Sequence, residues 1–127
     1  MTGGSGAPKS RRMTDRLVIA LAQLSQSVGD LRGNADRMLE VRAAHSRADL
    51  VVFPEFQLIG YPTEDLVLKP ALHRAADAEL VRLAAATGDG GPAMLVGSTH
   101  LVDGKLHNAV YLLDGGAVAG VTLKHEL

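Results

Sequence analysis

The chain has 127 residues, of which 46% are hydrophobic and 21% charged, a balance typical of one folded domain rather than a disordered chain. Its formal net charge of −1 argues against a nucleic-acid partner, and its apolar runs are shorter than the roughly 18 residues of a membrane span. The absence of cysteine excludes a disulfide, a thiolate metal site and a thiol nucleophile within these 127 residues.

Residues 1–14 are predicted to be a disordered leader, and residues 15–127 a single domain. The leader contains glycine, serine and proline followed by Lys9, Arg11 and Arg12, a composition that buries no apolar surface. It has no apolar stretch after its basic residues, so it does not match a signal peptide, and we expect a cytoplasmic location. A weak attraction to an anionic surface is the alternative role for these basic residues.

The next segments predict a β-α-β unit. Residues 17–24 form an unbroken apolar run, which is typical of a strand covered on both faces and predicts a central strand. Asp30 or Asn34 can cap the helix that follows, and His45 near its end is interpreted as a solvated residue beside the helix dipole. The apolar stripe of this helix comprises Leu31, Ala35, Met38 and Leu39. A second apolar run, residues 50–53, then predicts a strand parallel to the first.

The rest of the chain predicts a helix, a strand and an antiparallel meander. The apolar stripe of the helix comprises Leu72, Ala76, Leu80, Leu83 and Ala84, and glycines at 88, 90 and 91 stop it. Residues 94–98 read as a third buried strand. Asp103-Gly104 and Asp114-Gly115-Gly116 lie between apolar runs and are strong turn signals, so residues 101–123 are expected to form two hairpins.

His100 and His107 flank the first of these turns. Two imidazoles across a hairpin are able to bind zinc, but no third ligand lies at a fitting spacing, so we interpret them as exposed turn histidines. The glycines form neither a dinucleotide-binding fingerprint nor a Walker loop after a strand, so phosphate binding has no support.

Glu55 is the strongest candidate for chemistry. Pro54 has no backbone N–H and ends the apolar run before it, so Glu55 comes just past a strand end, where ligands bind in sheets flanked by helices. Apolar neighbours such as Phe56 and Leu58 partly desolvate a carboxylate, which raises its pKa and suits it to proton transfer. The alternative is that Glu55 only caps the next helical turn.

Lys124 also lies just beyond a predicted strand, which ends at Leu123. Taken by itself, it is interpreted as an ordinary solvated lysine.

The order of these features resembles the carbon–nitrogen hydrolases of the nitrilase superfamily. The resemblance covers the first strand, Gly29-Asp30 and Asn34, the Ala-Asp-Leu-Val-Val-Phe-Pro-Glu segment of residues 48–55, and positions as far as the Lys-x-x-Leu of residues 124–127. It implies an α/β fold, namely a partial αββα sandwich with a mixed sheet flanked by helices. It also implies a glutamate–lysine–cysteine triad, in which Glu55 matches the general base and Lys124 the lysine that stabilises the oxyanion.

Residues 60–70, Gly-Tyr-Pro-Thr-Glu-Asp-Leu-Val-Leu-Lys-Pro, resemble the glutaminase domains of glutamine-dependent NAD synthetases in particular. Such domains hydrolyse L-glutamine, and the ammonia passes to a synthetase domain that uses ATP and Mg²⁺ to amidate deamido-NAD. The resemblance implies that this chain holds no cofactor or metal, that a C-terminal synthetase domain is its partner, and that copies associate into a homo-oligomer. Neither a nucleic acid nor a membrane is implied as a partner.

The sequence departs from the family in its missing thiol. The cysteine of the family follows the lysine, whereas this sequence stops at Leu127, and neither Ser98 nor Thr99 occupies that position. We therefore expect an inactive N-terminal fragment of the glutaminase domain, with exposed sheet surface and a tendency to aggregate. Another amidase of the superfamily and a non-catalytic interaction module with the same fold are the alternatives.

Overall fold

The computed structural model describes residues 16–24, 30–54, 57–59 and 70–124. The predicted leader, Glu55 and the Gly-Tyr-Pro-Thr-Glu-Asp-Leu segment of residues 60–66 all lie outside these ranges. Among the residues that are described, no helix is both long and apolar enough to cross a membrane. The cytoplasmic location stays a prediction.

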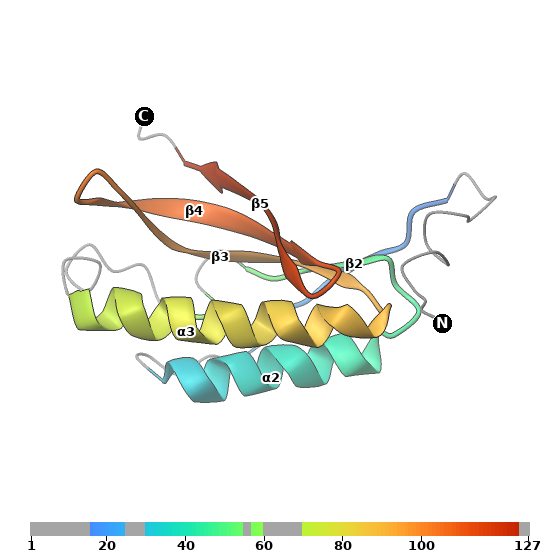
Figure 1. The fold of residues 1–127 in the computed structure, drawn as a ribbon. Coiled ribbons are helices and arrows are strands. Elements are labelled where there is room, and N and C mark those ends of the chain that lie inside the picture. Colours follow the sequence, from blue (N-terminus) through green and yellow to red (C-terminus); the bar gives the residue numbers. More distant parts are fainter. Residues whose placement is uncertain (1–15, 25–29, 55–56, 60–69, 125–127) are drawn as a thin grey trace.

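The elements of the described chain alternate between strands and helices in its first half and are strands in its second half (Figure 1). They are β1 (Ile19–Leu21), α2 (Leu31–Ala44), β2 (Leu50–Val52), α3 (Pro70–Ala86), the 3₁₀ turn η2 (Thr87–Asp89), β3 (Ala93–Val102), β4 (Lys105–Asp114) and β5 (Ala117–Leu123).

The strands form one mixed sheet with the order β1-β2-β3-β4-β5. β1, β2 and β3 pair parallel to one another, whereas β4 pairs antiparallel to both β3 and β5. The predicted β-α-β unit and the predicted antiparallel meander are both confirmed. β4 runs opposite to β3, and β5 runs opposite to β4, so β5 runs in the same direction as β3. The strands β1, β2, β3 and β5 therefore all run the same way.

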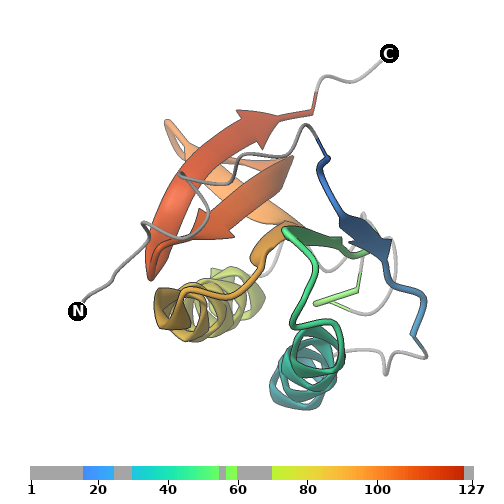
Figure 2. The same ribbon diagram turned by 90° about the vertical axis from the view of Figure 1, so that its right-hand side faces the viewer.

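Both helices cover the same face of the sheet, α2 below the side of β1 and β2, and α3 below β3, β4 and β5 (Figure 2). The core lies between these two layers, and its fully buried members include Met38, Val51, Leu83, Met94 and Leu113. The prediction of a mixed sheet flanked by helices is therefore confirmed, with the described residues forming one helix layer and one sheet layer of the αββα arrangement.

Helix α2 begins as its sequence predicts. The side chain of Asp30 caps it by accepting a hydrogen bond from the backbone N–H of Gly33 at 3.1 Å. Asn34, the other candidate cap, is instead buried and donates from Nδ2 to the carbonyl of Leu58 at 2.9 Å. Leu31, Ala35 and Met38 are buried as predicted, because their spacing places them on the face toward the sheet.

Helix α3 buries the predicted stripe against the sheet. Ala76, Leu80, Leu83 and Ala84 are buried, and Leu72 is half-buried. The helix ends at Ala86, continues as one 3₁₀ turn, and stops at Gly90, which has a left-handed φ of 81°. This backbone conformation favours glycine, so the predicted glycine stop is confirmed.

The two hairpins also follow local sequence signals. Asp103 and Gly104 have φ values of 50° and 78°, and Gly115 and Gly116 have φ values of 63° and 87°. Two consecutive left-handed residues match the right-handed twist of paired strands, which is why these dipeptides favour tight hairpins.

The position predicted for the first strand is wrong. The apolar run of residues 17–24 does not form a central strand, because β1 covers only residues 19–21 and lies at the edge of the described sheet. Two of its three side chains are exposed, Ile19 at 47% and Leu21 at 80%, whereas Ala20 is half-buried against the core. The apolar composition of a run predicts that a strand forms and is buried. It does not predict whether a second strand pairs with the other edge of that strand. The expectation of exposed sheet surface is confirmed at β1.

A buried arginine joins the end of α2 to the start of β3. The Nε of Arg42 donates to the carbonyl of Pro92 at 2.9 Å, and its two terminal nitrogens lie 3.0 and 2.6 Å from the carboxylate oxygens of Asp89. The hydrogen bonds from Arg42 lower the pKa of Asp89 to about 2, although partial burial opposes this shift.

This pair predicts a loss of stability in acid. Because the pKa of Asp89 falls from 3.8 to about 2 on folding, its contribution is present above pH 3.8 and is lost as the pH falls toward 2. The Asp89 side chain is 59% exposed, so solvent screening limits the effect to about 1 kcal/mol or less. Urea unfolding of the native chain and of Asp89→Asn between pH 5 and pH 2 measures it. The difference between the two proteins should shrink across this window, whereas a constant difference would contradict the prediction.

Candidate active site

The predicted site residue Lys124 lies at the carboxyl end of β5. Its backbone N–H donates to the carbonyl of Asn108 at 2.9 Å, which extends the β4–β5 pairing by one residue beyond Leu123. Its side chain is exposed. The sequence prediction that Lys124 follows a strand end is therefore confirmed.

Glu55 lies outside the described residues, so its proximity to Lys124 stays a prediction. The neighbouring residues define where the chain leaves β2: Val52 pairs with Leu95, and the N–H of Phe53 donates to the carbonyl of Leu95 at 3.2 Å. Since β2 and β5 run the same way, Pro54 and Lys124 leave the sheet at the same end.

The strand register limits how far apart these two exits lie. Leu123 pairs with Ala109, and Ala109 pairs with Ser98, which is three residues beyond the Leu95 partner of β2. The ends of β2 and β5 are therefore offset by about 10 Å along the strands and by three strand spacings, about 14 Å, across the sheet.

A cluster of polar side chains lies near the same end of the sheet, between α3 and the β3–β4 hairpin. His73 Nδ1 lies 2.8 Å from Thr99 Oγ1, and His73 Nε2 lies 3.3 Å from Asp77 Oδ2. The hydroxyl of Tyr111 donates to the carbonyl of Thr99 at 2.6 Å and lies 2.9 Å from Nδ1 of His100. We call these five residues the His73 cluster. No motif in the sequence indicated it, because its members come from three elements.

The Tyr111 hydroxyl in this cluster is held in its protonated form. Burial raises the pKa of Tyr111 to about 12, and the negative charge of Asp77 adds to the increase. The hydroxyl therefore remains a hydrogen-bond donor to the Thr99 carbonyl throughout the neutral pH range.

The interpretation of the two hairpin histidines as exposed turn residues is wrong. His100 and His107 are direct partners across β3 and β4, and both are half-buried. The ring of His100 packs edge-on against Tyr111, with 5.8 Å between ring centroids. The described ranges contain no group of three or more His, Asp or Glu side chains that could hold a metal ion.

Buried polar atoms in three further residues were not predicted from the sequence either. The side-chain amide of Gln57, the hydroxyl of Ser98 and Nε of Arg37 are buried and make no hydrogen bond in the part of the chain that the structure describes. Such atoms destabilise a fold unless a partner satisfies them.

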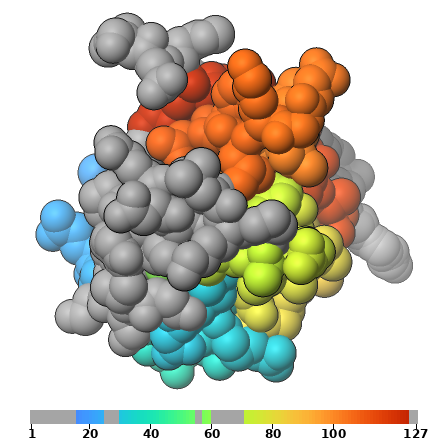
Figure 3. Space-filling view, turned by 90° about the vertical axis from the view of Figure 1, so that its left-hand side faces the viewer, coloured from blue at the N-terminus to red at the C-terminus, as the bar shows by residue number. Residues whose placement is uncertain are grey.

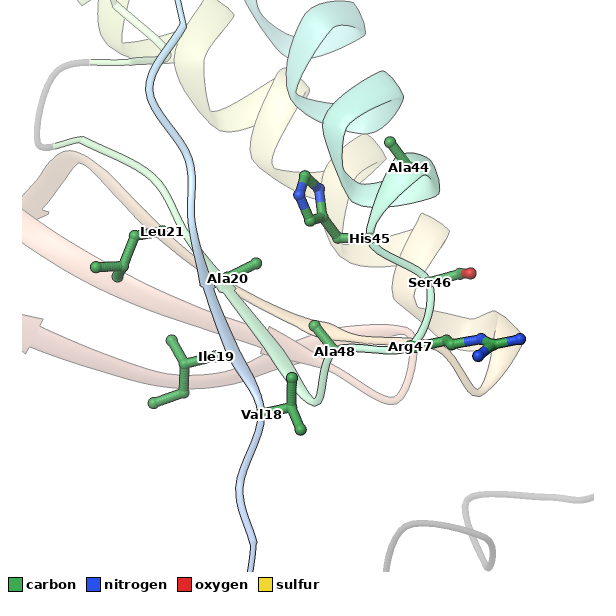
Figure 4. Close-up of a pocket in the computed structure, with 9 residues that line it drawn as sticks. All are labelled: Val18, Ile19, Ala20, Leu21, Ala44, His45, Ser46, Arg47 and Ala48. Atoms are coloured by element: carbon green, nitrogen blue, oxygen red, sulfur yellow. The ribbon is translucent and has the colours of Figure 1, made fainter.

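An open groove of about 490 Å³ lies elsewhere on the molecule, between β1 and the end of α2 (Figure 4). Its lining runs from Val18 to Leu21 and from Ala44 to Ala48. Since Ala48 precedes β2, the groove lies at the opposite end of β2 from the exit toward Glu55, and it contains none of the predicted site residues.

Comparison with known proteins assigns the family. The family model described as carbon-nitrogen hydrolase matches residues 18–127, so the chain belongs to the carbon-nitrogen hydrolase family.

Individual relatives and solved structures agree with this family. The chain is 44% identical over 117 residues to the glutamine-dependent NAD(+) synthetase of Rhodobacter capsulatus, a match that covers 91% of this chain and 21% of the relative. The glutamine-dependent NAD(+) synthetase of Acinetobacter baumannii superposes with a TM-score of 0.78 and 32% identity, over 87% of this chain and 21% of that one. An amidase from Nesterenkonia sp. has a TM-score of 0.71 at 23% identity, over 87% of this chain and 43% of that one, which shows a shared fold.

The chain thus spans about a fifth of the length of the curated relatives that it matches. The recognised resemblance to carbon–nitrogen hydrolases is confirmed.

Proposed function

We propose that this chain is the N-terminal part of a glutamine amidohydrolase domain, which supplies ammonia for the ATP-dependent amidation of deamido-NAD to NAD. The observation that carries the proposal is the 44% identity over 117 residues to a glutamine-dependent NAD(+) synthetase. The Gly-Tyr-Pro-Thr-Glu-Asp-Leu segment of residues 60–66 and the position of Lys124 at the sheet end support it.

In this proposal Glu55 is the general base. The attacking thiol must lose a proton before it adds to the amide of L-glutamine, and the leaving ammonia must gain one. A carboxylate at the exit of β2 with a polar but partly desolvated setting suits both transfers.

Lys124 stabilises the oxyanion in the same proposal. The tetrahedral intermediate of amide hydrolysis carries a negative oxygen, and one well-placed donor lowers its free energy by about 3 kcal/mol. The hydrogen bond from the Lys124 N–H to Asn108 fixes the start of this side chain relative to the sheet.

The nucleophile and the ligase chemistry are assigned to polypeptide other than these 127 residues, which contain no cysteine. ATP and Mg²⁺ belong in this proposal to a synthetase domain, and the described residues offer no cluster of His, Asp or Glu suited to that ion. Association into a homo-oligomer and a cytoplasmic location are the remaining parts of the proposal.

Ammonia release from L-glutamine tests the function. The 127-residue chain alone should release none, and turnover above that of its Glu55→Gln variant would overturn the proposed inactivity. A fusion enzyme, in which residues 16–127 replace the matched region of the Rhodobacter capsulatus relative, should release ammonia because the relative supplies the remaining polypeptide. A folded fusion enzyme without activity would instead favour the non-catalytic interaction module, and activity confined to amides other than L-glutamine would favour another amidase.

A further inference from the structure

His73, in the first turns of α3, is engaged at both ring nitrogens. Nε2 faces the carboxylate of Asp77 at 3.3 Å, and Nδ1 lies 2.8 Å from the hydroxyl of Thr99. A carboxylate only accepts hydrogen bonds, so the ring proton of neutral His73 belongs on Nε2, and Nδ1 accepts from the Thr99 hydroxyl. The start of α3 and the β3–β4 hairpin lie side by side on the surface shown in Figure 3.

Thr99 is therefore held from two directions. Its side chain bonds to His73 of α3, and its backbone carbonyl accepts the hydroxyl of Tyr111 from β4. Thr99 itself is only 2% exposed, so water does not compete effectively for either bond. A hydroxyl this deeply buried is also unable to meet a substrate, which excludes the Asp77–His73–Thr99 arrangement as a nucleophilic triad.

Thr99 lies in the same cross-strand row of the sheet as Lys124. Thr99 pairs with Asn108 across β3 and β4, and the carbonyl of Asn108 accepts the N–H of Lys124 across β4 and β5. Thr99, Asn108 and Lys124 thus form one row across three strands, about 10 Å from end to end. The row contains the last β4–β5 hydrogen bond that the structure describes, one residue beyond the end of β5, and strand ends open more readily than strand centres.

We propose that His73 is a positioning residue, which holds the Thr99–Asn108–Lys124 row through Thr99 and so fixes where the Lys124 side chain begins. The catalytic meaning of this inference rests on the proposed function, in which Lys124 stabilises an oxyanion. The anchoring itself does not depend on that function.

Hydrogen exchange of the Lys124 amide in the full 127-residue chain, followed by NMR, tests the anchor. In His73→Phe and in Thr99→Val the amide should exchange about fivefold faster, because each variant removes one partner of a buried hydrogen bond. His73→Asn, which retains a polar atom near the Nδ1 position, and Thr99→Ser, which retains the hydroxyl, should restore most of the protection. His45→Gln is the matched control, since His45 is exposed at the end of α2, and it should change nothing.

A double variant separates anchoring from general destabilisation. If His73 acts through Thr99, His73→Phe combined with Thr99→Val should exchange no faster at Lys124 than either single variant. The buried Met38 of α2 provides the reference amide, because its exchange reports the whole fold rather than the row.

Three results would overturn the anchor: unchanged exchange at Lys124 in both single variants, an equal increase at Met38, or single effects that multiply in the double variant. Should His73→Phe not fold, Thr99→Val alone carries the test, because it removes the hydroxyl that His73 contacts, and a Lys124 amide that exchanges no faster there would overturn the proposal. Loss of the proposed function, tested by ammonia release from the fusion enzyme, leaves these exchange rates unaffected, so the two failures are distinguishable.

Discussion

Replacing Glu55 by glutamine in the fusion enzyme should lower kcat for ammonia release from L-glutamine by about 10²–10⁴-fold, the usual loss when general acid–base catalysis is removed. Glutamine has nearly the same shape as glutamate but neither accepts nor returns a proton near neutral pH. Steady-state ammonia release at saturating L-glutamine measures the change, with KM expected to change little.

The matched control for this variant is Glu40→Gln. Glu40 is exposed on α2, away from the end of the sheet that carries Lys124, and the same chemical change there should leave kcat unaltered. A Glu55→Gln enzyme that retained more than a tenth of the parent kcat would show that Glu55 is not the base.

Replacing Lys124 by methionine should lower kcat in the same enzyme by about 10²–10³-fold, as expected when one oxyanion donor is removed. Methionine preserves most of the length of the side chain and all of the backbone, including the N–H that donates to Asn108. The loss therefore reports the ammonium group rather than the pairing of β5. Single-turnover kinetics, which isolate the chemical step from product release, provide the measurement.

Lys105→Met is the control for the ammonium. Lys105 is exposed at the start of β4, beside the first hairpin turn, and should tolerate the same replacement with no change in rate. Equal effects of Lys105→Met and Lys124→Met would point to a general effect of charge and contradict the assigned role.

The parts of the fold that the sequence predicts well are those with a local cause. Asp30 caps α2 because its carboxylate reaches an N–H only three residues away, and Asp103-Gly104 forms a hairpin because both residues tolerate a positive φ. Neither feature requires information about distant residues. The apolar stripes of both helices are predicted for the same reason.

The features that sequence reasoning missed depend on residues far apart in the chain. Residues 17–24 show that a strand is apolar, but the choice between edge and centre depends on which other strand pairs with it. The bond between His73 and Thr99 joins residues 26 positions apart, and it becomes visible only once α3 lies under β3.

The candidate site was predictable to a similar extent. The position of Lys124 beyond a strand end followed from the apolar run before it. The shared direction of β2 and β5 depends in addition on the parallel pairing of β2 with β3, which the sequence analysis did not predict. The half-buried setting of His100 was not predictable, and neither was the side-chain amide of Gln57, which has no hydrogen-bond partner among the described residues. Both depend on how the turns and helices pack over the sheet.

The edge position of β1 has a consequence for the behaviour of the protein in solution. One side of β1 pairs with β2, while no described strand pairs with its other side, and the residues from Leu17 to Leu21 bear no charge that would repel a neighbour. Such an edge is a template onto which another backbone adds by main-chain hydrogen bonding. We therefore expect concentrated protein to associate by intermolecular strand addition at this edge.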